Sequence, residues 1–308
     1  MNSMRFVYGP VPSRRLGISL GISPIPKKTC NYSCVYCQLG RTDKMTNIRK
    51  MFFPVQKIMS EVNEILRKEI FFDVITIVGE GEPTLYAGLG DLIDQIKDKT
   101  DKPVALITNG ALLYDCAVRR EVAKADIVMP TLDAYDEASL KKINRPFGKI
   151  SFESVNNGLI AFSEEYEGEL WLEIMLMASI NDDNESLKKY VQALQKIKYN
   201  RLYLNTPVRP PAEIEVRAVP YEKMNKISTF LGGISIDLLV SQGFHSEIED
   251  DYQAIISIIK RHPMNQFEIK SFLSSRNCKQ INYIMDMLDC AENINIITYR
   301  GFNTYRLK

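Results

Sequence analysis

The apolar positions of the chain change spacing repeatedly from about residue 55 onward. Val62, Ile65 and Leu66 recur at the spacing of one helix face, and the apolar run 74–78 that follows is typical of a strand buried on both faces. The same alternation predicts further helices at 92–96, 111–123, 159–162, 187–197 and 221–231, and further strands at 104–107, 127–129, 171–177 and 202–204. Repeated strand–helix units indicate a parallel sheet with helices outside it, and roughly six repeats favour a partial or complete (β/α) barrel over an open sheet.

The pattern of apolar positions changes after the last of these strand–helix units. The segment 241–251 joins a glycine to a run of acidic residues and is predicted to be a linker. Beyond it, two helical stretches at about 264–274 and 279–290 precede strand-like segments at 294–299 and 304–307. This order is typical of a small winged helix-turn-helix. We therefore expect an α/β barrel domain over 1–240, a linker over 241–251 and a winged-helix domain over 252–308.

Charge is segregated along the chain although it nearly cancels overall. The 308 residues include 39 Lys and Arg against 38 Asp and Glu, for a net charge of +1. Residues 1–50 hold nine basic residues and one acidic residue, whereas residues 252–308 hold eight and four, so the middle of the chain is acidic. The total excludes a globally basic nucleic-acid binder and leaves a local basic face open.

Composition also limits the cellular setting. The chain starts without an apolar signal region, and no apolar run approaches the roughly 20 residues that a membrane helix needs. Six cysteines among 308 residues are too few for a disulfide scaffold. We expect a protein of a reducing compartment, the cytoplasm.

Three of the cysteines stand close together in an early loop. Cys30, Cys34 and Cys37 form a C-x3-C-x2-C pattern, whose thiolates suit an iron–sulfur cluster or zinc. Cys116 lies about 80 residues away in a helical pattern, so no fourth ligand is obvious. Three thiolates favour a four-iron cluster with one iron free to bind a small chelating ligand. The alternatives are three buried cysteines, or a zinc site in a non-catalytic protein that recruits a partner through its tail.

On this motif the chain resembles the radical S-adenosylmethionine (SAM) superfamily, from residue 16 to about residue 240. The resemblance implies a partial (β/α)6 barrel, and a [4Fe–4S] cluster held by Cys30, Cys34 and Cys37. It implies that the remaining iron chelates the amino and carboxylate groups of SAM. Electron transfer from an external donor of the flavodoxin or ferredoxin type would then cleave SAM to a 5′-deoxyadenosyl radical.

The same resemblance implies further cofactor-binding residues. Tyr36 stands where the family places an aromatic residue near the adenine. Gly81-Glu82-Pro83 is similar to the family's Gly-Gly-Glu-Pro segment, which contacts the methionyl amino group, with Glu80 in place of the first glycine. The end of a parallel strand independently favours this segment as a site, the alternative being an ordinary loop with a solvated glutamate. Other strand-end residues expected to contact SAM or substrate are Thr108, Asn109, Asp133, Glu173 and Asn205.

Two further segments, 8–17 and 141–146, resemble relatives of the wyosine-forming tRNA enzymes. Those enzymes build a second iron–sulfur cluster from cysteines upstream of the main motif. Here no cysteine precedes Cys30. The subgroup resemblance is therefore a weak guide to the reaction, and wyosine formation itself is not expected.

The substrate is the least determined part of the prediction. The candidate residues for binding an anionic substrate are Arg14, Arg15, Arg145 and Arg209, although Arg14 and Arg15 could equally be solvated surface charges. The tail offers Lys279, Arg300, Arg306 and Lys308 to phosphates, but its second helix carries Asp286 and Asp289. A nucleic-acid partner and a protein partner are thus both open for the tail. Candidate substrates are tRNA, a peptide or protein, and a small metabolite.

Overall fold

A computed structural model describes residues 6–68, 70–236, 244, 246 and 248–308 of the chain. Its centre is one eight-stranded sheet in which neighbouring strands are parallel, except that the first two are antiparallel. In spatial order the strands are β1 (Val7–Ser13), β2 (Gly17–Ile22), β5 (Val74–Ile77), β6 (Val104–Thr108), β7 (Ile127–Pro130), β8 (Glu169–Met175), β9 (Arg201–Asn205) and β10 (Ile234–Ser235). The parallel sheet follows from the apolar, β-branched runs that the sequence places between helices.

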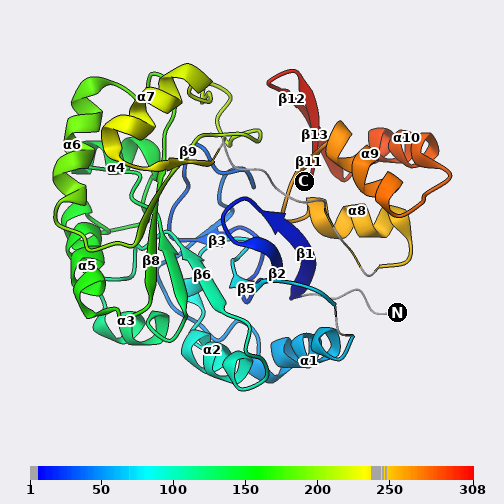
Figure 1. Cartoon of the computed structure of the whole chain (residues 1–308), viewed down its shortest axis with the longest axis horizontal. Coiled ribbons are helices and arrows are strands. Elements are labelled where there is room, and N and C mark those ends of the chain that lie inside the picture. Colours follow the sequence, from blue (N-terminus) through cyan, green and yellow to red (C-terminus); the bar gives the residue numbers. More distant parts are fainter. Residues whose placement is uncertain (1–5, 69, 237–243, 245, 247) are drawn as a thin grey trace.

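Seven helices follow the strands and lie in an arc outside the sheet (Figure 1). They are α1 (Val55–Leu66), α2 (Leu89–Lys97), α3 (Cys116–Val122), α4 (Glu137–Ile143), α5 (Phe152–Glu165), α6 (Asn184–Leu194) and α7 (Tyr221–Leu231). The described chain thus runs through six strand–helix units, with α4 and α5 sharing the unit that begins at β7. The apolar faces of the helices pack on the sheet and form the main core.

Among these seven helices, one begins later than predicted, and one was not predicted. α3 begins at Cys116 rather than at residue 111, because the Asp115 side chain accepts a hydrogen bond from the Ala117 N–H at 2.8 Å and caps the helix there. The short helix α4 was not predicted. It begins with a capping box between Asp136 and Ser139.

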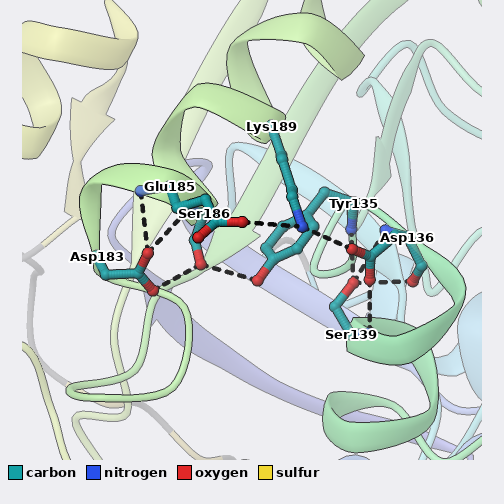
Figure 2. A network of polar contacts seen from close by, with 7 residues as sticks. All are labelled: Tyr135, Asp136, Ser139, Asp183, Glu185, Ser186 and Lys189. Atoms are coloured by element: carbon teal, nitrogen blue, oxygen red, sulfur yellow. Dashed lines mark hydrogen bonds and ion pairs between the residues drawn. The ribbon is translucent and has the colours of Figure 1, made fainter.

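A polar network joins the start of α4 to the start of α6 (Figure 2). Lys189 Nζ lies 3.0 Å from Asp136 Oδ2 and 5.0 Å from the centre of the Tyr135 ring. The Tyr135 hydroxyl in turn lies 2.8 Å from Ser186 Oγ in the first turn of α6. These contacts fix the loop between β7 and α4, which carries Asp133.

The cysteine segment lies between β2 and α1. A small parallel pair, β3 (Thr29–Cys30) and β4 (Lys44–Met45), encloses it. Hydrogen bonds from Cys37 N to Cys34 O at 3.1 Å and from Gly40 N to Cys37 O at 3.0 Å give the segment two tight turns. The three thiols are therefore carried by a loop of defined shape.

Residues 251–308 form a second unit, called the C-terminal unit below. It comprises α8 (Asp251–Ile259), β11 (Met264–Asn265), α9 (Gln266–Ser275), α10 (Ile281–Cys290), β12 (Ile294–Tyr299) and β13 (Phe302–Leu307). Its strands form an antiparallel sheet in the order β11–β13–β12, and it has its own apolar core. The two predicted helices and the hairpin are present, whereas α8 was not predicted.

Two remaining sequence expectations concern other parts of the chain. Five of the eleven residues of the predicted linker, at 241–243, 245 and 247, lie outside the described residues, as does the chain start at 1–5. Within the described chain, no helix has the length and apolar character needed to cross a membrane.

Candidate active site

A cavity of about 440 Å³ opens at the carboxyl ends of the parallel strands. The cysteine loop, the strand-end loops, the β1–β2 hairpin and the C-terminal unit all line it. The predicted site residues that line this cavity are Arg14, Arg15, Cys30, Cys34, Tyr36, Cys37, Gly81, Glu82, Thr108, Asn109, Glu173, Asn205 and Arg209. Pro83, Asp133 and Arg145 are not among the lining residues. The fold thus collects at one place residues that are up to 195 positions apart in the sequence (Arg14 to Arg209).

The three cysteines are free thiols, half-buried at the wall of the cavity. Cys30 Sγ accepts a hydrogen bond from Tyr32 N at 3.4 Å, and Cys34 Sγ accepts one from Asn144 Nδ2 at 3.4 Å. Burial raises the pKa of all three thiols above the usual range. Thiolates at this place therefore need a positive centre beside them.

An iron–sulfur cluster fits this donor set. Iron binds thiolates, and its charge stabilises the deprotonated form that burial alone disfavours. In the part of the chain that is described, no three His, Cys, Asp or Glu side chains converge on the position of a single metal ion. A four-iron cluster does not require the three thiolates to reach one ion. Each thiolate would bind its own iron, so the three sulfur atoms need only surround a common space.

Glu82 is the organising carboxylate of the neighbouring loop. Its Oε1 accepts hydrogen bonds from Thr108 Oγ1 at 2.6 Å and Thr84 Oγ1 at 2.7 Å, and its Oε2 accepts one from Asn109 N at 2.7 Å. The side chain is buried, which raises its pKa, whereas the hydrogen bonds from Asn109, Thr108 and Thr84 act in the opposite direction. Glu82 therefore ties the end of β5 to the end of β6. Pro83 begins the short 3₁₀-helix η1 (Pro83–Leu85) that leads away from the cavity.

Asn109 links that loop to the cysteines. Its Nδ2 donates to Asn31 Oδ1 at 2.7 Å and lies 3.7 Å from Cys30 Sγ. Its Oδ1 accepts a hydrogen bond from Ala111 N at 2.9 Å, so the amide orientation is set by both ends. Asn109 thus places an N–H donor toward the first cysteine.

Tyr36 and Asp133 form a pair behind the cysteine loop. The Tyr36 hydroxyl donates to Asp133 Oδ2, which also accepts from Asn144 Nδ2 at 3.1 Å, while Oδ1 accepts from Met175 N at 3.0 Å. Burial raises the pKa of Asp133 to about 6. Asp133 was expected to contact the cofactor or substrate, but here its oxygens bind protein donors and it holds Tyr36 in place.

Glu173 and Asn205 meet across two neighbouring strands. Asn205 Nδ2 donates to Glu173 Oε1 at 3.2 Å, and Arg15 from the β1–β2 connection pairs with Glu173 Oε2. Two predicted cofactor contacts, Glu173 within β8 and Asn205 at the end of β9, are thus close together. Arg15, a substrate candidate, is ion-paired with one of them.

The other three arginine candidates do not all lie at the same place. Arg209 follows β9 and donates to Glu268 Oε1 and Oε2 at 3.1 Å each, to the Pro263 carbonyl, and to His262 Nε2. Burial lowers the pKa of Arg209 and the pKa of His262. The charge of nearby Arg14 lowers both pKa values further. Arg145 instead pairs with Glu213, as does Arg41, outside the cavity. Of the four, Arg209 joins the sheet domain to the C-terminal unit.

Sequence reasoning missed several lining residues. The C-terminal unit supplies Arg261, His262 and Glu268, and the sheet domain adds Tyr8, Lys28 and Glu80. The Arg-His-Pro run at 261–263 follows an apolar helical stretch, and this boundary between helix and turn was the available signal. These residues line the cavity only because the C-terminal unit docks against the sheet domain. The local sequence pattern does not reveal that docking.

Comparisons with known proteins agree with this geometry. The family model described as Radical SAM superfamily matches residues 25–191. The chain is 38% identical over 285 residues to UPF0026 protein MJ1312 of Methanocaldococcus jannaschii, covering 89% of this chain and 88% of that protein.

Two solved structures share the fold. A radical SAM methyltransferase from Sphaerobacter thermophilus superposes with a TM-score of 0.54 at 13% identity, covering 71% of this chain and 68% of that one. SuiB from Streptococcus suis, bound to S-adenosylmethionine, gives a TM-score of 0.54 at 15% identity, covering 70% of this chain and 47% of that one. At these identities the likeness concerns the fold alone.

Proposed function

This chain belongs to the radical SAM superfamily, and on that premise we propose that it modifies a substrate held in the strand-end cavity. Members of the family bind SAM and a [4Fe–4S] cluster. When bound, the two together supply the 5′-deoxyadenosyl radical, by one-electron cleavage of SAM to that radical and methionine. The observation that supports the proposal is the meeting of three thiols, the Glu82 loop and the strand ends at one cavity.

Different residues of this chain would bind the cluster and SAM. Cys30, Cys34 and Cys37 would hold the cluster, and Asn109 would donate toward the Cys30 sulfur. Gly81 would expose its backbone to the methionyl end of SAM, since Glu82 is occupied by protein donors. Such hydrogen bonds around the sulfurs and limited access of water tune the centre and protect a radical.

We propose that the sheet domain is a partial (β/α)6 barrel and that the C-terminal unit is a winged helix that covers its open side. The order of helices and hairpin in residues 252–308 supports the second assignment. Arg306 Nη1 donates to the Gln38 carbonyl at 3.2 Å, and Lys27 Nζ donates to the Lys308 carbonyl at 2.5 Å. Two tail residues proposed for phosphate contact therefore lie against the cysteine segment.

This arrangement favours a substrate small enough to be enclosed whole, such as a small metabolite. The cavity volume of about 440 Å³ lies within the range of small-molecule sites. A tRNA substrate would have to insert a nucleotide beneath the C-terminal unit. An external flavodoxin- or ferredoxin-type donor and a cytoplasmic setting complete the proposal, and the six free cysteines are compatible with that setting.

The cluster assignment is tested by metal analysis of protein purified without oxygen. Wild-type protein should contain about four irons per chain and show the brown absorption of an iron–sulfur cluster. Cys34→Ala should lose both, whereas the control Cys116→Ala should keep both, because Cys116 is exposed on α3. One zinc per chain with no SAM binding would instead support a non-catalytic metal-binding protein.

The substrate class needs a separate experiment. Reduced protein is incubated with SAM and deuterium-labelled cell extract, and fractions are followed for transfer of deuterium into 5′-deoxyadenosine. A label from a small-molecule fraction is expected. A label from the RNA fraction, with RNA affinity that falls steeply with salt, would contradict the enclosed-substrate proposal in favour of tRNA.

A further inference from the structure

Glu80 occupies the position at which the family's SAM-binding segment has its first glycine, and its carboxylate faces the C-terminal unit. Glu80 Oε2 lies 3.5 Å from Arg261 Nε, and the two side chains are 6% and 4% exposed. Arg261 follows α8 and also stacks over the Tyr8 ring of β1, at 4.8 Å from its centre. The departure from glycine thus coincides with a buried ion pair between the two parts of the molecule.

The backbone of Glu80 belongs to the predicted SAM site. Glu80 O accepts a hydrogen bond from Lys28 N at 2.5 Å, and Glu82 N donates to Thr29 O at 3.1 Å. A Cβ atom on Gly81 would lie 1.8 Å from Thr29 O, so the two segments are in direct backbone contact. A displacement of Glu80 would therefore move both the Gly81–Glu82 backbone and the segment that leads into Cys30.

Arg261 makes the ion pair with the carboxylate of Glu80, and the charge of Lys27 also acts on that carboxylate. Among the described residues, none donates a hydrogen bond to its buried Oε1. A buried carboxylate without a cation is strongly disfavoured. Arg261 is in turn held at this place because Arg209, Glu268 and His262 join the neighbouring turn to the loop after β9.

We infer that Glu80 and Arg261 are positioning residues that make SAM binding depend on the docked C-terminal unit. The inference rests on the proposed function, because it concerns affinity for SAM. With the pair intact, the C-terminal unit holds the segment 80–82 against residues 28–29 in the conformation that binds the methionyl end. Coupling of this kind is reciprocal, so bound SAM also strengthens the docking of the C-terminal unit.

The test is a double-mutant cycle on the affinity for SAM, measured by calorimetry on cluster-reconstituted full-length protein. Glu80→Gln and Arg261→Met should each weaken SAM binding about tenfold. The double variant should bind SAM no more weakly than the weaker single variant, because the same contact is lost once. Arg261→Lys, which keeps the cation, should restore most of the affinity. The matched control is Lys270→Met, which removes an exposed cation from α9 of the same unit, and it should bind SAM as the wild type does.

Iron content and melting temperature show that each variant is folded and loaded, and hydrogen exchange gives a readout without SAM. Arg261→Met should increase exchange of the amides at 79–82, whereas Lys270→Met should not. Single variants with wild-type affinity, or a double variant weakened about a hundredfold by independent losses, would overturn the inference. Failure of the wild-type protein to bind SAM would overturn the proposed function, and the inference with it.

Discussion

Charged side chains around the cavity are held by partners from distant parts of the chain. Arg15 pairs with Glu173, 158 positions away, and Arg209 pairs with Glu268, 59 positions away. The C-x3-C-x2-C spacing could be interpreted from sequence because its chemistry is local. The ion pairs could not be predicted, because charge alone does not determine which carboxylate an arginine contacts. For this reason Arg145 was expected at the substrate and is found on Glu213 instead.

The Arg145–Glu213–Arg41 cluster makes a prediction about pH. The two guanidinium groups lower the pKa of Glu213 to about 2 from its usual 4.5. Glu213 therefore contributes stability above pH 4.5 that is lost as the pH falls through about 2. Because Arg41 is largely exposed and screened, Glu213→Gln should cost only about 1 kcal/mol at pH 7. Urea unfolding of both proteins should show this difference shrinking toward zero as the solution is acidified. A difference that is constant with pH would contradict it.

The strand–helix alternation was predictable because each element buries one continuous apolar face. β5, β6, β8 and β9 lie within two residues of their predicted positions. The β1–β2 hairpin was missed because its strands carry glycines and prolines rather than a clean alternation of apolar and polar residues. α4 was missed because seven residues are too short for a periodic pattern. α8 was missed because Ile255, Ile256, Ile258 and Ile259 form a nearly continuous apolar run.

The contact between the Gly81 loop and β3 predicts the effect of adding a single methyl group at position 81. Gly81→Ala would place a Cβ at 1.8 Å from a backbone oxygen, which cannot move without displacing the cysteine loop. It should destabilise the protein by roughly 3 kcal/mol and reduce iron incorporation. The control Gly148→Ala meets no atom within 4 Å and has only its φ of +63° to cost stability, about 1 kcal/mol. Equal iron content in the two variants would show that the contact is not needed.

The whole molecule consists of a sheet domain whose strand-end cavity is partly walled by the C-terminal unit. Sequence could separate the two units by their patterns, but their docking depends on single residues such as Arg209, Arg261 and Tyr299. The Tyr299 hydroxyl, for example, donates to the Pro207 carbonyl at 2.8 Å. Two helices and the hairpin of the tail could therefore be predicted, but not their position at the wall of the cavity.

Loss of the Arg209 contacts should loosen this arrangement. Arg209→Met leaves Glu268 without that cation and removes the donors to the Pro263 carbonyl and His262. We expect a loss of roughly 2 kcal/mol in the free energy of unfolding. Arg217→Met, an exposed change three positions before the α7 cap Pro220, should leave the unfolding curve unchanged. Thermal unfolding of the two variants checks this, and equal melting temperatures would contradict the proposed role.

The central claim is that this cavity generates a radical from SAM, and chromatography of the products tests it most directly. Wild-type protein, purified and reconstituted without oxygen, is mixed with SAM and a strong reductant, and 5′-deoxyadenosine is quantified beside the Cys34→Ala and Cys116→Ala variants. Wild-type and Cys116→Ala protein should form 5′-deoxyadenosine, and Cys34→Ala should form none above background. Iron-loaded wild-type protein that forms no 5′-deoxyadenosine, or a Cys34→Ala variant that forms as much as the wild type, would contradict the central claim.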